Sequence, residues 1–391
     1  MPESRRLKSV QTPVIPVIAE LMRAHPGTIS LGQGVVNYGP PPSAVAEVTR
    51  FFAEPETHKY QGVSGILPLR EKIVQKLAAE NGIEVGEARG NRLMVTAGGN
   101  QAFLNVVLAI LDPGDEVILP VPYYFNHEMA ITMANARPVL APTGSDCQLD
   151  LGTVSAAITP RTRAIVTVSP NNPSGAVYPE AALRAVNALC AKHGIYHIND
   201  EAYEYFTYDG ARHFSPASIS GASAHTISLY SMSKAFGFAS WRIGWMVFPA
   251  ELEPAMQKIQ DTVIICPPVI GQYAAAGALG QGHAFVKEKL RALAETRAMV
   301  QRQLHILEKA GLAEVPPASG ALYFLLRLRS QLTPLACAAR LIREHGVAVI
   351  PGDAFGLVTG CHIRIAYGAL QPATAAQGLV RLVAGVQALR E

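Results

Sequence analysis

The chain has 391 residues, of which 49% are hydrophobic and 16% charged, and its formal net charge is +3. This length is enough for two domains, and so apolar a composition indicates a well-packed globular enzyme and excludes a disordered protein. The net charge is small and no basic stripe with interleaved aromatic residues is present, which argues against nucleic acid as a partner.

The cysteines and the apolar segments indicate in which cellular compartment the protein is located. Five cysteines lie at scattered positions without a C-x-x-C pair, which favours reduced thiols in a cytoplasm and predicts no metal site. The first ten residues lack the apolar run of a signal peptide. The apolar stretch 263–279 contains Pro267, Pro268 and Gln272, and falls short of a membrane span. We therefore expect a cytoplasmic protein without a membrane partner.

The first part of the chain is rich in glycine and proline. Residues 1–30 predict an arm and one short helix over 17–22. Two dense glycine segments follow, Leu-Gly-Gln-Gly at 31–34 and Tyr-Gly-Pro-Pro-Pro at 38–42. Glycines this close together indicate close backbone approach or positive φ, although an ordinary loop fits them as well. Helical periodicity then predicts helices over 43–52 and 68–81.

From residue 93 onward, short apolar runs alternate with helical patterns. The pattern predicts strands over 93–96, 116–119, 163–169, 195–199, 226–230 and 243–248, and helices over 102–111 and 179–193. Alternation of this kind predicts a mostly parallel sheet with helices on both faces. Sites in such folds gather at the carboxyl ends of the strands.

Three polar or aromatic segments follow these predicted strands. The turn Gly98-Gly99-Asn100 opens a helix, and free backbone N–H groups at a helix N-terminus suit a phosphate. Tyr124 follows the second strand, where an aromatic ring can stack on a flat heteroaromatic ring or pack in the core. Asn172 follows the third strand and offers an amide donor, although its Asn-Pro-Ser-Gly context is also typical of a β-turn.

Asp200 ends a predicted buried strand, where an unpaired carboxylate would be costly. It therefore needs a cation, and a protonated pyridine nitrogen is one that a buried carboxylate would keep charged. The alternative is a cap at a strand–helix junction. Tyr203 follows three residues later.

Lys234 lies in a short turn between the apolar runs 226–230 and 243–248, with Ser231 and Ser233 before it. A lysine among apolar neighbours loses solvation and is more easily deprotonated, and a neutral amine can form a Schiff base with an aldehyde. Arg242, eight residues on, offers a fork of donors suited to a phosphate. These groups together predict a covalently held aldehyde with a phosphate tail, although an ordinary surface lysine also fits so short a motif.

The remaining chain predicts a second unit. Helices are expected over 254–260, 269–279, 283–310 and 334–345, strands over 322–328, 347–350 and 361–367, and a helix at the end. Arg364 lies inside the last strand, a position at which a lone arginine is usually exposed.

The segment 231–244 closely resembles the Schiff-base lysine motif of class I/II aminotransferases, which depend on pyridoxal 5′-phosphate (PLP) and have fold type I. The resemblance runs from about Ser30 to the end, and is greatest for kynurenine- and glutamine-aminotransferase-like members of the aspartate aminotransferase superfamily. Asn-Asn-Pro-Ser-Gly at 171–175 is a highly specific string of that family, and its spacing to Asp200 also matches.

The resemblance implies an α/β fold, with a mostly parallel seven-stranded sheet between helices in a large domain and a smaller α+β domain. It implies an N-terminal arm and helix over 1–44 that belong with the small domain, a large PLP-binding domain over 45–285 and a small C-terminal domain over 286–391. It also implies cis peptide bonds at Asn172–Pro173 and Val121–Pro122.

The resemblance also assigns roles to individual residues. It makes Lys234, Asp200 and Tyr203 catalytic, and it gives Gly34, Asn172 and Arg364 to the substrate carboxylate. Tyr60 would reach across a homodimer interface to the cofactor phosphate of the other subunit. The implied cofactor-binding residues are Gly98, Gly99, Asn100, Tyr124, Asn172, Asp200, Tyr203, Ser231, Ser233, Lys234, Arg242 and Tyr60.

The implied reaction moves an amino group from an L-amino acid to a 2-oxo acid. Relatives of the aspartate type use an arginine near the equivalent of 267–273, and that stretch has none here, which favours a neutral, aromatic or sulfur-containing donor. The chain also has Val35-Val36-Asn37 where many relatives have Phe-Pro-Asp, and His127 where many have tyrosine. The alternative function is a PLP-dependent lyase or cyclase on the same fold, such as a β C–S lyase.

Overall fold

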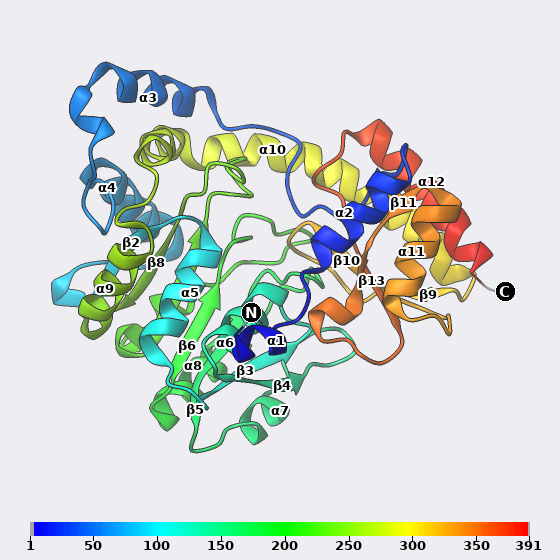
Figure 1. Ribbon diagram of the computed structural model, residues 1–391, viewed down its shortest axis with the longest axis horizontal. Coiled ribbons are helices and arrows are strands. Elements are labelled where there is room, and N and C mark those ends of the chain that lie inside the picture. Colours follow the sequence, from blue (N-terminus) through cyan, green and yellow to red (C-terminus); the bar gives the residue numbers. More distant parts are fainter. Residues whose placement is uncertain (1–3, 390–391) are drawn as a thin grey trace.

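A computed structural model describes residues 4–389. A large seven-stranded sheet with its helices lies beside a smaller four-stranded sheet with its own helices (Figure 1). In the described residues the helices are α1 (Arg5–Ser9), α2 (Val14–Ala24), α3 (Pro42–Ala53), α4 (Leu67–Lys76), α5 (Gly99–Ile110), α6 (Phe125–Met133), α7 (Leu151–Ala156), α8 (Glu180–His193), α9 (Glu253–Ile264), α10 (Val269–Lys309), α11 (Pro334–His345) and α12 (Pro372–Ala388).

The large sheet has the strand order β2-β8-β7-β6-β5-β3-β4, in which β8 runs opposite to the other six strands. The mostly parallel sheet predicted from the sequence pattern, and the seven strands that the family resemblance implies, are therefore confirmed. Its strands are β2 (Asn91–Thr96), β3 (Glu116–Val121), β4 (Arg137–Pro142), β5 (Thr162–Val168), β6 (Tyr196–Asp200), β7 (Thr226–Ser231) and β8 (Gly244–Pro249).

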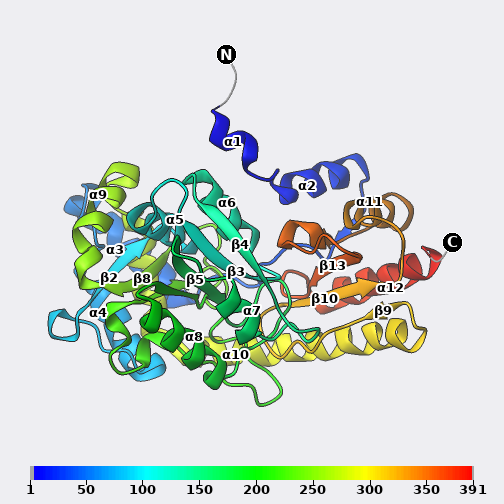
Figure 2. The ribbon, with the colours of Figure 1, turned by 90° about the horizontal axis from the view of Figure 1, so that it is seen from below.

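Both faces of this sheet are covered by helices, with α5 and α6 on one side and α7 and α8 on the other (Figure 2). Successive residues of β3 show why. Val117 and Leu119 pack in the cluster that contains Phe103 of α5, whereas Ile118 packs in the cluster that contains Val186 of α8. Side chains alternate between the faces of a strand, so a run that is apolar at every position is stable only between two layers of helices.

The smaller unit is built on the antiparallel sheet β12-β13-β10-β9, together with the parallel pair β1 and β11. The N-terminal strand β1 thus pairs with a strand far along the chain. The bounds are β1 (Ile29–Ser30), β9 (Ala313–Glu314), β10 (Tyr323–Leu328), β11 (Val347–Ala348), β12 (Ile350–Pro351) and β13 (Cys361–Ala366).

Helix α10 runs from the large sheet to the small one (Figure 1, yellow). The sequence predicted two helices, 269–279 and 283–310, and the structure joins them across a kink at Gly282, whose φ of 50° and ψ of −138° are not helical. Glycine permits such a conformation because it has no Cβ. The two predicted helices are therefore halves of one bent element.

The structure also contains helices and strands that the sequence pattern did not predict, namely α1, α6, α7, β1, β4 and β9. Strand β4 is an edge strand with a single buried residue, Ala141, so it lacks the apolar run by which the inner strands were found. The predicted helix 68–81 consists of α4 followed by a π-helical turn over Leu77–Asn81.

Within residues 4–389, no single helix has both the length and the apolar character needed to cross a membrane. Residues 250–264 and 269–309 meet that test only as a pair, and they are bent by 120° at the break between them.

Candidate active site

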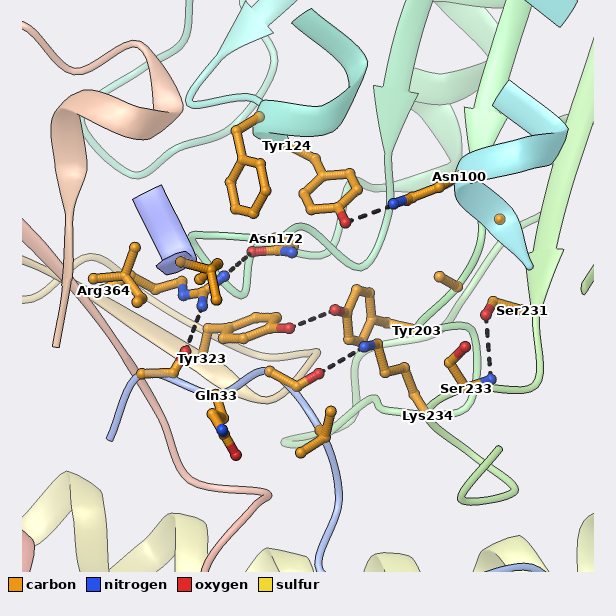
Figure 3. A pocket seen from close by; sticks show the side chains of 18 of the residues that line it. Gln33, Asn100, Tyr124, Asn172, Tyr203, Ser231, Ser233, Lys234, Tyr323 and Arg364 are labelled. Atoms are coloured by element: carbon orange, nitrogen blue, oxygen red, sulfur yellow. Dashed lines mark hydrogen bonds between the residues drawn. The ribbon is translucent and has the colours of Figure 1, made fainter. Parts of the chain in front are cut away.

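A cavity of about 430 Å³ lies at the carboxyl ends of the large sheet's strands, between that sheet and the smaller unit. Figure 3 shows side chains from both units pointing into it. Each of the predicted residues Gly34, Gly99, Asn100, Tyr124, Asn172, Asp200, Tyr203, Ser231, Ser233, Lys234, Arg242 and Arg364 lines this cavity. Gly98 lies directly beside it, and Tyr60 does not line it.

One end of the cavity is formed by the start of α5 and by Arg242. Gly98 has φ of 85°, and a Cβ there would lie 2.4 Å from Nη2 of Arg242. Only glycine therefore allows the guanidinium to lie against this turn. Arg242 itself has φ of 57°, and its Nη1 and Nη2 donate to the carbonyl oxygens of Ala239 at 2.9 Å and Ala97 at 3.1 Å.

Helix α5 has no side-chain cap, so its first N–H groups are available to a ligand. Ser231 and Ser233 line the same end, and Oγ of Ser231 accepts a hydrogen bond from the Ser233 N–H at 3.2 Å. A helix N-terminus, a guanidinium and two hydroxyls together form a site suited to a phosphate dianion.

Asp200 ends β6 and is held from two sides. Its Oδ1 accepts from the N–H of Ala202 at 3.0 Å, and its Oδ2 lies 3.1 Å from Nε2 of His127. His127 is buried and stacks on Phe103, with the ring centroids 4.0 Å apart. The role of His127 was open from the sequence, and the structure places it behind Asp200, where it fixes the orientation of the carboxylate.

Two tyrosines face the middle of the cavity. Tyr124 donates to Oδ1 of Asn100 at 3.3 Å and accepts from Nδ2 of Asn126 at 2.7 Å, while burial raises its pKa to about 12. The hydroxyl of Tyr203 is hydrogen-bonded to that of Tyr323. Burial raises the pKa of Tyr203 well above its ordinary value. The hydroxyls of Tyr124 and Tyr203 are therefore both neutral at physiological pH and can donate hydrogen bonds.

Lys234 follows β7, and its Nζ donates to the carbonyl oxygen of Gly34 at 2.6 Å. Burial lowers its pKa to about 8, the positive charges of Arg364 and Arg242 add to this effect, and Asp200 opposes it. The neutral amine is therefore far more populated near pH 7 than for an exposed lysine.

Arg364 is only 3% exposed, unlike most lone arginines in strands. Nearly all of β13 is buried, so the usual alternation does not carry the side chain to solvent. Its Nη1 donates to Oδ1 of Asn172 at 2.8 Å and its Nη2 to the carbonyl of Gly32 at 2.7 Å. Nε has no partner among the described residues, so three of the five N–H donors remain for a ligand.

Both predicted cis peptide bonds, Val121–Pro122 and Asn172–Pro173, are present. A third, Ser169–Pro170, was not predicted.

The sequence did not single out several residues that line the cavity. Tyr323 lies on β10, within a predicted strand whose side chains had no assigned direction. Four apolar residues come from α2, and only the contact of α2 with the rest of the chain shows which side of the helix faces the cavity. They are Ile15, Ile18, Ala19 and Met22.

Comparison with known proteins gives one family. The model for aminotransferase class I and II matches residues 26–382. An aromatic aminotransferase of Arabidopsis thaliana is 32% identical over 395 residues, covering 99% of this chain and 96% of the relative. The aspartate/prephenate aminotransferase of Thermus thermophilus is 36% identical over 353 residues, covering 89% and 88%.

The fold leads to the same family. The solved structure of Thermus thermophilus aspartate aminotransferase with maleate matches with a TM-score of 0.89 at 32% identity, covering 98% of this chain and all of that one. These relatives are all aminotransferases, and nothing in them favours the lyase or cyclase alternative.

The cavity also fits the cofactor of that family. Its phosphate end, its carboxylate on β6, its phenols and its buried amine match the phosphate, the pyridine nitrogen, the phenolic oxygen and the aldehyde of PLP. A Cβ at Gly98 would fill the cradle that Arg242 occupies. The chain belongs to the aminotransferase class I and II family, and it is a PLP-dependent aminotransferase of fold type I.

Proposed function

We propose that Lys234 anchors PLP covalently and carries the proton during amino transfer between an L-amino acid and a 2-oxo acid. The observation that supports this most directly is the position of Lys234, whose Nζ lines the cavity and donates to the Gly34 carbonyl at 2.6 Å, and whose pKa is lowered to about 8 by burial and by the charges of Arg364 and Arg242. When bound, PLP supplies an aldehyde and an electron-withdrawing pyridinium ring. The protein residues then bind, orient and move protons.

Binding of the cofactor is proposed to start at its phosphate. Arg242, Ser231, Ser233 and the N-terminus of α5 hold the phosphate, and Tyr124 contacts the ring. Asp200, oriented by His127, keeps the pyridine nitrogen protonated, because a buried carboxylate favours a neighbouring cation. Tyr203 and Asn172 donate hydrogen bonds to the phenolic oxygen.

Lys234 is proposed to act as the general base once the substrate amine has released it. The Gly34 carbonyl, 2.6 Å from Nζ, holds the amine at this edge of the cavity. Because the pKa of Lys234 is close to physiological pH, its amine can remove the α-proton of the substrate. The protonated amine can then give a proton back in the later step of amino transfer.

Arg364 is proposed to bind the substrate α-carboxylate. Its Asn172 and Gly32 bonds fix the guanidinium plane and leave Nε and one N–H on each Nη for a two-point contact. Arg364→Lys is expected to lower kcat/KM about ten- to hundredfold, since lysine cannot form two parallel bonds.

In Arg364→Lys, PLP binding should stay unchanged, because other residues hold the phosphate, and the loss should be similar for every amino donor. Steady-state kinetics with several donors, together with a cofactor titration, checks both points. A loss confined to acidic donors would show that Arg364 contacts the substrate side chain instead.

The donor is proposed to be neutral, aromatic or sulfur-containing. Among residues 4–389, the lysines and arginines that line the cavity are Lys234, Arg242 and Arg364, and each already has a proposed role. The α2 face adds apolar surface in the form of Ile15, Ile18 and Met22. A second carboxylate would therefore lack a cation from this chain. An absorbance scan with a panel of amino donors and 2-oxo acids tests both the reaction and this preference.

A homodimer with shared sites is also proposed. Tyr60 is 78% exposed, and Phe52 and Leu67 nearby in the sequence are 63% and 62% exposed. Large apolar side chains exposed to this extent are typical of a protein interface. We expect sedimentation analysis at assay concentration to show a dimer, and Tyr60→Phe to weaken PLP binding. A fully active monomer would contradict this proposal.

The boundaries 1–44, 45–285 and 286–391 are proposed as domain limits. The pairing of β1 with β11 supports the assignment of the N-terminal segment to the small domain.

A cytoplasmic location is also proposed. It is supported by the five cysteines, which are all free thiols in the described structure.

A further inference from the structure

Tyr323 lies where the cofactor residues and the carboxylate residues meet (Figure 3). It is 1% exposed, its hydroxyl is bonded to that of Tyr203, and its ring lies against the guanidinium of Arg364, 4.4 Å from the ring centroid. Building on the function proposed above, we propose that Tyr323 is a positioning residue that directs the Tyr203 proton toward the phenolic oxygen of PLP and holds the plane of Arg364.

The direction of the hydrogen bond between Tyr203 and Tyr323 decides which of the two hydroxyls can donate to a cofactor oxygen. Each tyrosine hydroxyl has one proton to donate. If Tyr203 donated to Tyr323, it would have no proton left for a cofactor oxygen. If Tyr323 donates instead, Tyr203 is free to donate into the cavity. The bond between the two hydroxyls therefore has to run from Tyr323 to Tyr203 whenever Tyr203 serves the cofactor.

Arg364 favours that direction. The guanidinium carbon of Arg364 lies 4.4 Å from the ring centroid of Tyr323, and this neighbouring positive charge acts to lower the pKa of that phenol against the effect of burial. The more acidic of two hydroxyls is the better donor in a bond between them. A chain of hydrogen bonds also polarises its members, so donation from Tyr323 strengthens Tyr203 as a donor.

The ring of Tyr323 has a separate effect. The guanidinium of Arg364 lies between two aromatic rings, 4.4 Å from the centroid of Tyr323 and 5.1 Å from that of Phe355. Such stacking suits the flat, weakly hydrated guanidinium and restricts its tilt. Because phenylalanine retains a ring, Tyr323→Phe removes only the hydroxyl effect, whereas Tyr323→Leu removes both.

The hydroxyl also explains the glycine at position 34. A Cβ on Gly34 would lie 2.2 Å from Oη of Tyr323 and 3.0 Å from its Cζ. The carbonyl of Gly34 in turn accepts the bond from Nζ of Lys234. Gly34→Ala is thus expected to displace the Tyr323 hydroxyl, and its effect should be smaller when Tyr323 is already phenylalanine.

The test uses the PLP-loaded protein, with Tyr367→Phe as matched control. Tyr367 is buried near Tyr323, donates to the Ala321 carbonyl at 2.9 Å and does not line the cavity. Two quantities are measured. One is the pH midpoint of the bound cofactor's absorbance change, and the other is the Kd for 3-phenylpropionate, a monocarboxylate without an amino group.

Tyr323→Phe should raise the pH midpoint by about half a unit to one unit, because the anionic phenolic oxygen loses part of its donor, and should leave the Kd within about twofold. Tyr323→Leu should raise the midpoint similarly and weaken 3-phenylpropionate about five- to tenfold. Tyr367→Phe should move neither quantity.

An unchanged midpoint in Tyr323→Phe, or an equal change in Tyr367→Phe, would overturn the positioning role. Failure of the function proposed above would look different, because the wild-type protein would then show no cofactor absorbance that depends on Lys234. The two failures are therefore separable within one set of measurements.

Discussion

Lys234→Ala is expected to lower amino transfer by at least about 10⁴-fold, because the variant loses both the covalent anchor and the general base. The fold should persist, since the buried amine is itself unfavourable in the protein, as its lowered pKa shows. Single-turnover kinetics with an amino donor measures the loss. Borohydride treatment followed by peptide mass analysis should find the reduced cofactor bond on Lys234 in the wild type and none in the variant.

Lys309→Ala, which removes an exposed lysine at the end of α10, is the control and should retain the adduct. The pH dependence gives an independent check. Because a neutral amine is needed, the rate at which the apoprotein captures PLP should rise with pH below about 8 and level off above it. A stable adduct on another lysine would contradict the assignment.

Asp200→Ala is expected to lower kcat by roughly two to four orders of magnitude while the fold survives. The reason is that a protonated pyridine nitrogen left without its buried carboxylate loses its proton, and the ring then withdraws electrons poorly. Near-normal activity would rule out this role for Asp200.

Asp200→Asn separates charge from shape, because the amide oxygen can still accept from the Ala202 N–H. The kcat of Asp200→Asn should therefore be almost as low as that of Asp200→Ala. His127→Asn should cost much less, since it removes only the group that orients Asp200 at 3.1 Å. Thermal unfolding of each apoprotein checks that the fold is retained.

Much of this site could be predicted from local sequence. Gly99, Tyr124, Asn172, Asp200 and Lys234 each end or follow a strand that its apolar run revealed, and parallel strands bring their carboxyl ends to one edge. The strands of the sheet other than β4, and the residues along their carboxyl edge, therefore follow from short segments without knowledge of their long-range contacts.

The remaining features depend on contacts between distant segments. Tyr323 meets Tyr203 only because the small sheet is placed against the large one, and no local pattern contains that placement. The pairing of His127 with Asp200 has the same origin. Arg364 was assigned by resemblance alone, because strand periodicity favours an exposed arginine and only the covering layers make it buried.

The edge position of β2 has a consequence for how the protein is made on the ribosome. Strand β2 pairs only with β8 in the large sheet, in a register that joins Asn91 to Pro249. Because β8 (Gly244–Pro249) lies far along the chain from β2 (Asn91–Thr96), β2 leaves the ribosomal exit tunnel well before β8, at a synthesis rate of about 5–20 residues per second. Until β8 emerges, the turn at Gly98 has neither its sheet partner nor Arg242, so a nascent chain cannot hold a phosphate at the start of α5. We therefore expect the protein to bind its cofactor only after β8, the last strand of the large sheet, has been synthesised.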